Sequence, residues 1–393
     1  MLSFIVAFEI VIMISPFAVF FYSVFNPVLL TLSRWPATRW LTAFFLPHMI
    51  VPPDGFLVAV RVLGSALFLV GLAAFLICAI QVYASKALKT GPAIGGLYAV
   101  IRHPQYVALA WAALGLAIMW PRFLTLVLFA VMLFLYYVLA KDEERRMLAR
   151  HGDSYLAYMK RTGMFVPRAV ERLWRGGEGS PRPLGAGGGT AIFLALLVAS
   201  VGAGFALRAY TVRHLPLEAA ADIDVIGITA EDAAAGARLL QSAREDPGVL
   251  SRFRAEPVPP GGRRLVYVIP IDYTMQGMIA DTGEEWKLFM RHKTIGMITE
   301  YVIHPWSHLT EGHAGHAGPP ASMHDSPGLK RRMIFMDVSS PAGALASPRA
   351  DFGIGVRRKP LFFVDVHLHT GEVLGVRDIP PGSGWGTVPT PMF

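Results

Sequence analysis

Long apolar runs separated by short polar breaks fill the first half of the chain. A membrane-spanning helix needs roughly 20 mostly apolar residues, and five segments come close to that length or exceed it. Only Trp120, Pro121 and Arg122 separate the third segment from the fourth, so these two are expected to form a tight helical hairpin. Both outer ends of that hairpin then lie on the same membrane face. The predicted spans cover about residues 4–25, 56–84, 104–120, 122–140 and 191–210.

The second half of the chain has a different pattern, in which short segments alternate apolar and polar positions. Such alternation is typical of half-buried strands, and it begins at Arg263, Arg331 and Pro360. Residues 229–246 open with Thr229 as a helix cap and an acidic first turn, which predicts a helix. We therefore predict an α-helical membrane protein of about five transmembrane helices with a C-terminal soluble α+β domain.

A stretch rich in Gly and Pro precedes the fifth span, and this composition is typical of a flexible linker. This linker suggests where one domain of the chain ends and the next part begins. The expected parts are a helical membrane domain at 1–180, the linker at 181–190, the fifth transmembrane helix at 191–210 and a domain outside the membrane at 211–393.

The composition supports a membrane protein, because 53% of the residues are hydrophobic, only 16% are charged and the mean hydropathy is +0.45. The net charge of +8 would suit a nucleic-acid partner, but no compact basic and aromatic recognition motif accompanies it, so we expect none. The single cysteine, Cys78, excludes an intrachain disulfide and a cysteine zinc cluster.

Basic residues predict the orientation in the membrane, since cytoplasmic loops carry an excess of Lys and Arg. Residues 141–182 between the fourth and fifth spans are rich in both, whereas the loop between the first two spans carries only Arg34 and Arg39. The N-terminus is then cytoplasmic and the chain after Tyr210 lies outside. The expected location is a bacterial inner membrane with a periplasmic C-terminal domain.

The start of the third span carries unusual chemistry for a membrane boundary, namely Arg102, His103, Pro104 and Tyr106. Because of the tight hairpin, these residues are expected to lie near Glu143 and Glu144, which follow the fourth span. Each residue taken alone is well explained as an interfacial anchor or a solvated charge. Their combination favours a binding site instead, because anchoring requires neither His-Pro nor a double glutamate.

A pocket with two carboxylates, an imidazole, a guanidinium and tyrosines at the edge of the lipid suits S-adenosylmethionine. The carboxylate of that molecule can bind Arg102 or the helix start at Pro104, where backbone donors are free. Its ammonium and ribose hydroxyls can bind Glu143 or Glu144, and its adenine needs an apolar or aromatic slot.

The order of these residues resembles the integral-membrane superfamily of isoprenylcysteine carboxyl methyltransferases and phospholipid methyltransferases. The resemblance covers about residues 90–167, and it departs from the family at Ala108, where a glycine is frequent, and in the added outer domain. The residues that carry it are Gly96, Tyr98, Arg102, His103, Pro104, Tyr106, Glu143, Glu144, Leu148, Gly152, Tyr155, Tyr158 and Pro167.

The resemblance implies a site for S-adenosylmethionine that is open to the cytosol for the cofactor and to the bilayer for a lipophilic acceptor. His103 and Tyr106 would contact the cofactor, while Arg102 would orient its carboxylate or that of the acceptor. The implied catalytic residues are Arg102, His103, Glu143 and Glu144. The implied cofactor-binding residues are Gly96, Tyr98, His103, Pro104, Tyr106, Glu143, Tyr155 and Tyr158.

A second candidate site is the histidine-rich stretch at 304–324. Copper or zinc can bind imidazoles presented on such a loop, although loops of this kind also bind metals adventitiously. His367 and His369, two apart on a predicted strand, could add to it. The candidate metal ligands are His304, His308, His313 and His316.

Two functions compete at this point. The first is a methyltransferase that acts on the carboxyl oxygen or nitrogen of a lipophilic small molecule or lipid. The second is a non-catalytic subunit of a membrane complex, which uses the same helices as an anchor and binds a partner or a metal through residues 211–393.

Overall fold

In the computed structural model, the described part of the chain forms two compact units. The described residues within Ala59–Ala206 belong to the first unit, and those within Val24–Val58 and Leu207–Phe393 belong to the second. The sequence division had placed 24–58 in the membrane domain. The structure describes residues 26–47, 50, 54–89, 93–175, 186–220, 223–273, 276, 279–280, 282, 327–341, 343–345 and 347–380.

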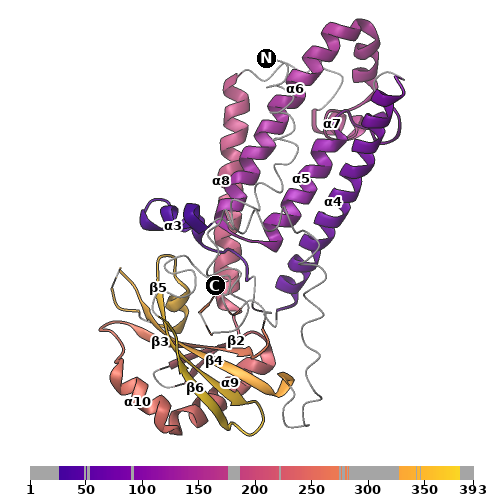
Figure 1. The fold of residues 1–393 in the computed structure, drawn as a ribbon. Coiled ribbons are helices and arrows are strands. Elements are labelled where there is room, and N and C mark those ends of the chain that lie inside the picture. The colour runs from indigo at the N-terminus through magenta and orange to yellow at the C-terminus, as the bar shows by residue number, and fades with distance from the viewer. Residues whose placement is uncertain are drawn as a thin grey trace. The chain divides into compact units, whose positions relative to one another are not determined.

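The helical unit is built from long apolar helices that run side by side (Figure 1). Three of them are long and apolar enough to cross a membrane, and a fourth, α5, is a shorter apolar helix. The first predicted span lies outside the described residues. The helices are α4 (Gly55–Ala87), α5 (Pro104–Met119), α6 (Phe123–Arg161), α7 (Arg168–Arg175) and α8 (Ala186–Arg213), with a short 3-10 helix η2 at Gly96–Ala99.

The predicted hairpin is present, because α5 ends at Met119 and α6 begins at Phe123. Helix α6 continues about 20 residues beyond the predicted end of its span at 140, as far as Arg161. Gly152 interrupts it with φ 52° and ψ −125°, a conformation that glycine adopts without steric cost. The chain therefore turns sharply there, and the residues after Gly152 lead back toward the start of α5.

Glycines let α4 and α5 approach each other closely. A Cβ atom built on Gly115 would lie 2.4 Å from the backbone nitrogen of Phe68, and one on Gly71 would lie 2.5 Å from that of Ala112. Small residues allow such close backbone packing between membrane helices. By contrast, the outward side of α4 carries large exposed apolar side chains such as Leu69 and Ile80, as expected of a surface in contact with lipid.

The described residues of the C-terminal domain form a six-stranded sheet in the order β1-β2-β3-β4-β5-β6, in which β2 and β3 pair in parallel and the other neighbours pair antiparallel. Helices α9 and α10 connect these two strands, and α9 lies on the sheet (Figure 1). The elements are β1 (Leu217–Ala220), β2 (Ile223–Gly227), α9 (Ala230–Glu245), α10 (Pro247–Ala255), β3 (Arg263–Pro270), η7 (Pro327–Leu329), β4 (Lys330–Ser339), η8 (Pro348–Phe352), β5 (Arg357–His367) and β6 (Val373–Asp378).

Local sequence signals explain these elements. Thr229 accepts a hydrogen bond from the backbone nitrogen of Asp232, and the Asp232 side chain accepts one from the Thr229 nitrogen, which completes a capping box at α9. The apolar face of α9 then packs Leu239 and Leu240 into a core with Val266 and Phe335 from the sheet. The mixed α+β class predicted from the alternating pattern is confirmed.

Segment 24–58 contains helix α3 (Asn26–Arg34) and the 3-10 helix η1 (Arg39–Thr42). The buried guanidinium of Arg208 donates hydrogen bonds to the backbone oxygens of Phe44 and Phe352. Tyr210 donates to a carboxylate oxygen of Asp54 at 3.0 Å. These bonds explain why this early segment belongs to the same unit as the C-terminal domain.

A buried pair of carboxylates makes the stability of this domain sensitive to pH. Asp224 and Asp351 are almost fully buried, and Arg263 donates to Asp224 while its Nε lies 3.5 Å from Asp351. Burial, together with the charge of Asp224, raises the pKa of Asp351 to about 7. The raised pKa means that the folded state favours the protonated carboxyl of Asp351. The stability that this contributes is fully present below the ordinary carboxyl pKa near 3.8 and is lost as pH rises through 7.

We expect Asp351→Asn to abolish most of this pH dependence, because the amide does not ionise. The wild-type protein should lose on the order of 2–4 kcal/mol of stability between pH 4 and pH 8, and the variant much less. Thermal unfolding of the purified full chain across this range measures the difference. Asp378→Asn, at an exposed ion pair with Arg252, is the matched control. If the stability of Asp351→Asn varied with pH as steeply as that of the wild-type protein, Asp351 would not be the source of the pH dependence.

Candidate functional site

The hairpin brings together residues that are about forty positions apart in sequence. Arg102 and His103 directly precede α5, while Glu143 and Glu144 lie in the part of α6 that returns to the same level. The Nδ1 atom of His103 lies 3.3 Å from Oε2 of Glu143, and its Nε2 atom lies 3.4 Å from Oε1 of Glu144. The cluster expected from the sequence is therefore present.

His103 is at the centre of the cluster and is only 7% exposed. Its Nε2 atom is buried and makes no hydrogen bond, since the approach to Glu144 has an ion-pair distance without hydrogen-bond geometry. Burial alone would lower the pKa of His103, but the facing carboxylates of Glu143 and Glu144 outweigh it and raise the pKa above its ordinary value of 6.5. Protonated His103 thus forms its ion pairs with Glu143 and Glu144 fully below about pH 6.5. These ion pairs weaken as pH rises through the raised pKa of His103.

Tyr106 connects the polar cluster to the apolar interior. Its hydroxyl donates a hydrogen bond of 2.6 Å to Oε1 of Glu143. Its ring stacks on His103 at 5.6 Å between centroids and on Tyr136 of α6 at 4.9 Å. An aromatic column therefore leads from the carboxylates into the space between the helices.

Arg102 holds the end of α6 in place. Its Nε atom donates to Oε1 of Glu144 at 2.5 Å, and its Nη1 atom donates to the backbone oxygens of Met159 and Thr162. The planar guanidinium suits several fixed acceptors at once. In this structure Arg102 thus connects three parts of the chain, in addition to any role toward a ligand.

The segment after α6 returns along the start of α5. The backbone nitrogens of Arg102 and His103 donate to the backbone oxygens of Gly163 and Met164 at 2.8 and 3.2 Å. The ring of Phe165 lies 5.8 Å from that of His103. Sequence reasoning did not single out Met164 or Phe165, because their contribution depends on how far the chain turns back after Gly152.

The other predicted cofactor-binding residues surround this centre at different distances. Tyr158 is buried and its hydroxyl donates at 2.6 Å to the backbone oxygen of Tyr98, while the Tyr155 ring lies 5.7 Å from that of Tyr158. Pro104 is buried as the first residue of α5. Gly96 has a φ of +58°, and the side chain closest to it is that of Gln81 on α4, not that of His103.

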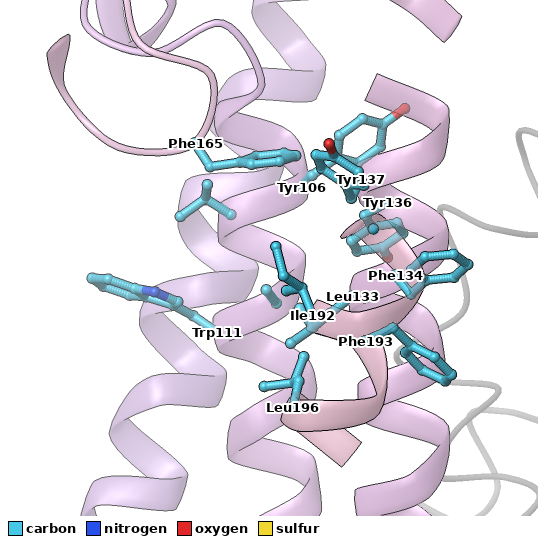
Figure 2. Close-up of a pocket in the computed structure, with 13 residues that line it drawn as sticks. Tyr106, Trp111, Leu133, Phe134, Tyr136, Tyr137, Phe165, Ile192, Phe193 and Leu196 are labelled. Atoms are coloured by element: carbon cyan, nitrogen blue, oxygen red, sulfur yellow. The ribbon is translucent and has the colours of Figure 1, made fainter. Parts of the chain in front are cut away.

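A cavity of about 420 Å³ lies beside the cluster, between α5, α6 and α8 (Figure 2). Tyr106 and Phe165 contribute to its wall, so the cavity begins where the polar cluster ends. Its remaining lining is almost entirely apolar. The sequence did not predict this cavity, since its wall combines three separate helices.

The predicted metal ligands His304, His308, His313 and His316 lie outside the described residues. Within the part of the chain that the structure describes, no group of three or more His, Cys, Asp or Glu side chains is arranged to hold a metal ion. The strand β5 ends at His367, so His369 lies in the following turn and not on the strand as predicted. Their rings are 6.1 Å apart.

Helices of membrane-spanning length thus carry an ionisable and aromatic cluster at the mouth of a helical hairpin. Residues 56–152 match the family model described as phospholipid methyltransferase. This match confirms the predicted relationship to the membrane methyltransferase superfamily. It covers α4, α5 and α6 as far as Gly152, and so includes all of Arg102, His103, Tyr106, Glu143 and Glu144. Neither a curated protein nor a solved structure gives a significant match.

Proposed function

We propose that this protein transfers a methyl group from S-adenosylmethionine to a lipophilic acceptor at the cytoplasmic boundary of the membrane. The observation that carries the proposal is the cluster in which His103 lies between Glu143 and Glu144 and next to Tyr106. The segment 56–152, which matches the phospholipid methyltransferase family model, contains the same residues and so supports the proposal. The many basic residues within 141–182 favour the cytoplasmic side.

The residues present fit such a cofactor. The buried Nε2 atom of His103 has no hydrogen-bond partner in the described structure, which a bound polar group would supply. Glu143 keeps 35% of its side chain exposed and can reach an ammonium or hydroxyl group. His103, Tyr106 and Glu143 would hold the cofactor, which supplies a methyl group on a positively charged sulfur.

The protein's own contribution is chiefly positioning. Holding two reactants in the productive geometry can remove on the order of 7–11 kcal/mol from the barrier. His103 and Tyr106, fixed by stacking and by Glu143, are rigid enough to orient a ligand. A carboxylate acceptor needs no base, whereas an amine acceptor loses a proton, which the carboxylate of Glu143, or His103 in its neutral form, would receive.

Binding of S-adenosylhomocysteine, followed by calorimetry on the detergent-solubilised full chain, tests the proposal. We expect saturable heat from the wild-type protein and affinity at least tenfold weaker for His103→Ala and for Glu143→Gln. Both changes remove a group in the cluster, whereas Asp142→Asn alters the neighbouring carboxylate that faces Arg145 and Arg146 at the surface. This control should bind as the wild-type protein does.

Thermal unfolding of each variant separates a loss of binding from a loss of folding. Absence of heat with the folded wild-type protein would overturn the proposal and leave the helices as an anchor for a larger complex.

A further inference from the structure

The apolar cavity beside the cluster has the size of a ligand site. Its volume of about 420 Å³ falls in the range of about 300–1,000 Å³ found for small-molecule pockets. It lies within the helical unit, between α5, α6 and α8. Figure 2 shows Tyr106, Tyr137 and Phe165 toward one end and Trp111 and Leu196 toward the other.

The cavity adjoins the proposed methyl-transfer site, because Tyr106 and Phe165 belong to both. Tyr106 lines it with its ring, while the hydroxyl of the same residue donates to Glu143. Phe165 lines it from the returning segment and contacts His103 with its ring. A molecule whose polar end reached His103 and Glu143 would therefore have its other end next to the cavity.

The lining restricts what that other end can be. Among the residues that form the wall in the described chain none is charged, and the polar side-chain atoms there belong to tyrosines and to Trp111. A charged group would lose its hydration without a partner, at a cost of several kcal/mol. The cavity therefore accepts hydrocarbon and excludes a second headgroup.

Helix α8 closes one side of the cavity, although it lies outside the segment 56–152 that matches the family. Gly189, Ile192 and Leu196 face the cavity from successive turns, which cover about 10 Å along the helix. A Cβ on Gly189 would come within 4.0 Å of the Tyr137 ring, so any larger side chain there would enter the space. This wall is therefore a feature of this chain beyond its matched part.

We infer that the cavity binds one hydrocarbon chain of the methyl acceptor and that α8 sets which chain fits, an inference that rests on the proposed function. An apolar cavity of about 150 Å³ holds one benzene molecule, so a cavity of about 420 Å³ takes a single chain or ring system on the order of 15 carbons. The acceptor class is a single-chain lipophile with its nucleophilic group at one end, rather than a two-chain phospholipid.

Photolabelling of the full chain in lipid nanodiscs tests this inference without a methyl donor. The probe is tetradecanol with a diazirine near the end of its chain, and adducts are located by mass spectrometry. We expect saturable labelling at Trp111 and Leu196, reduced at least tenfold by Gly189→Phe, which fills the cavity from α8. Ala110→Phe fills it from α5 and should act in the same way, so the result does not depend on the folding of one variant.

The matched control is Ala195→Phe, an exposed position on α8 that does not line the cavity, and it should leave labelling unchanged. Labelling that does not saturate, or that persists in both filled variants, would identify the cavity as a contact with bulk lipid and overturn the inference. Equal labelling by a phosphatidylcholine with the diazirine on one acyl chain would overturn the single-chain class.

The photolabelling result and the binding of S-adenosylhomocysteine test the acceptor cavity and the proposed function separately. Normal binding of S-adenosylhomocysteine with unsaturable labelling contradicts the acceptor cavity alone. Saturable labelling without binding of S-adenosylhomocysteine contradicts methyl transfer, and then the occupant is a bound lipid of a non-catalytic protein and the acceptor inference fails with it.

Discussion

Arg102→Ala should release the segment that returns from the end of α6 and weaken the binding of S-adenosylhomocysteine at least tenfold. The side chain of Arg102 is 8% exposed and that of Glu144 12%, so removal of the guanidinium leaves a carboxylate largely buried without its closest cation. Breaking such a pair costs on the order of 3 kcal/mol. The backbone oxygens of Met159 and Thr162 lose their donor at the same time.

Hydrogen exchange on the full chain measures this effect directly. Amides of residues 158–165 should exchange much faster in Arg102→Ala, because the contacts that hold them against residues 100–103 depend on Arg102. Arg102→Lys keeps the charge but lacks the planar guanidinium with its several donors. Its exchange rates at residues 158–165 should therefore lie between those of the wild-type protein and Arg102→Ala. Arg145→Ala, which removes only an exposed pair with Asp142, is the control. Unchanged exchange at 158–165 in Arg102→Ala would refute the positioning role.

Gly115→Leu should prevent α4 and α5 from packing and cost more than about 3 kcal/mol, since overpacking by smaller groups already costs about 1–3 kcal/mol. Around Gly115, a Cβ would lie 2.4 Å from the Phe68 nitrogen and 2.6 Å from the Gly64 oxygen. These are backbone atoms, so no side-chain rotation can relieve the clash. The helix start at His103 would then shift, and ligand binding would be lost with the fold.

Gly115→Ala and Gly202→Ala form the matched comparison for this prediction. A Cβ on Gly202 of α8 has no atom within 4 Å, so alanine there should be tolerated or slightly stabilising. Alanine at Gly115 should lower the unfolding temperature in detergent and increase the aggregated fraction in size-exclusion chromatography. A Gly115→Ala protein as stable as Gly202→Ala would mean that the two helices pack differently.

Much of the fold was predictable because its signals are local. The length of the apolar runs predicted α4, α6 and α8, and the three residues between α5 and α6 required a hairpin. The helix cap at Thr229 with its acidic first turn predicted α9, and the alternation after Arg263 predicted the strands. Strands β1 and β2 were not predicted, because they are short and one of them, β2, is buried throughout without alternation.

The candidate site was predictable in part for the same reason. A hairpin of two straight helices places His103 opposite Glu143, independently of how the other segments of the chain fold. Partners within the cluster were less predictable, since nothing in the sequence specified which of the two glutamates Arg102 would contact. In the structure, Arg146 pairs with Asp142 at the surface and Arg102 pairs with Glu144.

The sequence by itself determined the apolar helices, the hairpin and the presence of a polar cluster at its open end, because helix length and connection length depend only on neighbouring residues. Tertiary structure decided the rest. The return of residues 162–165 against His103 depends on the angle of the turn at Gly152. The cavity depends on α8 packing beside α5 and α6 across long intervals of sequence. Such contacts are selected by the free energy of the whole packed arrangement, which no local pattern of residues specifies.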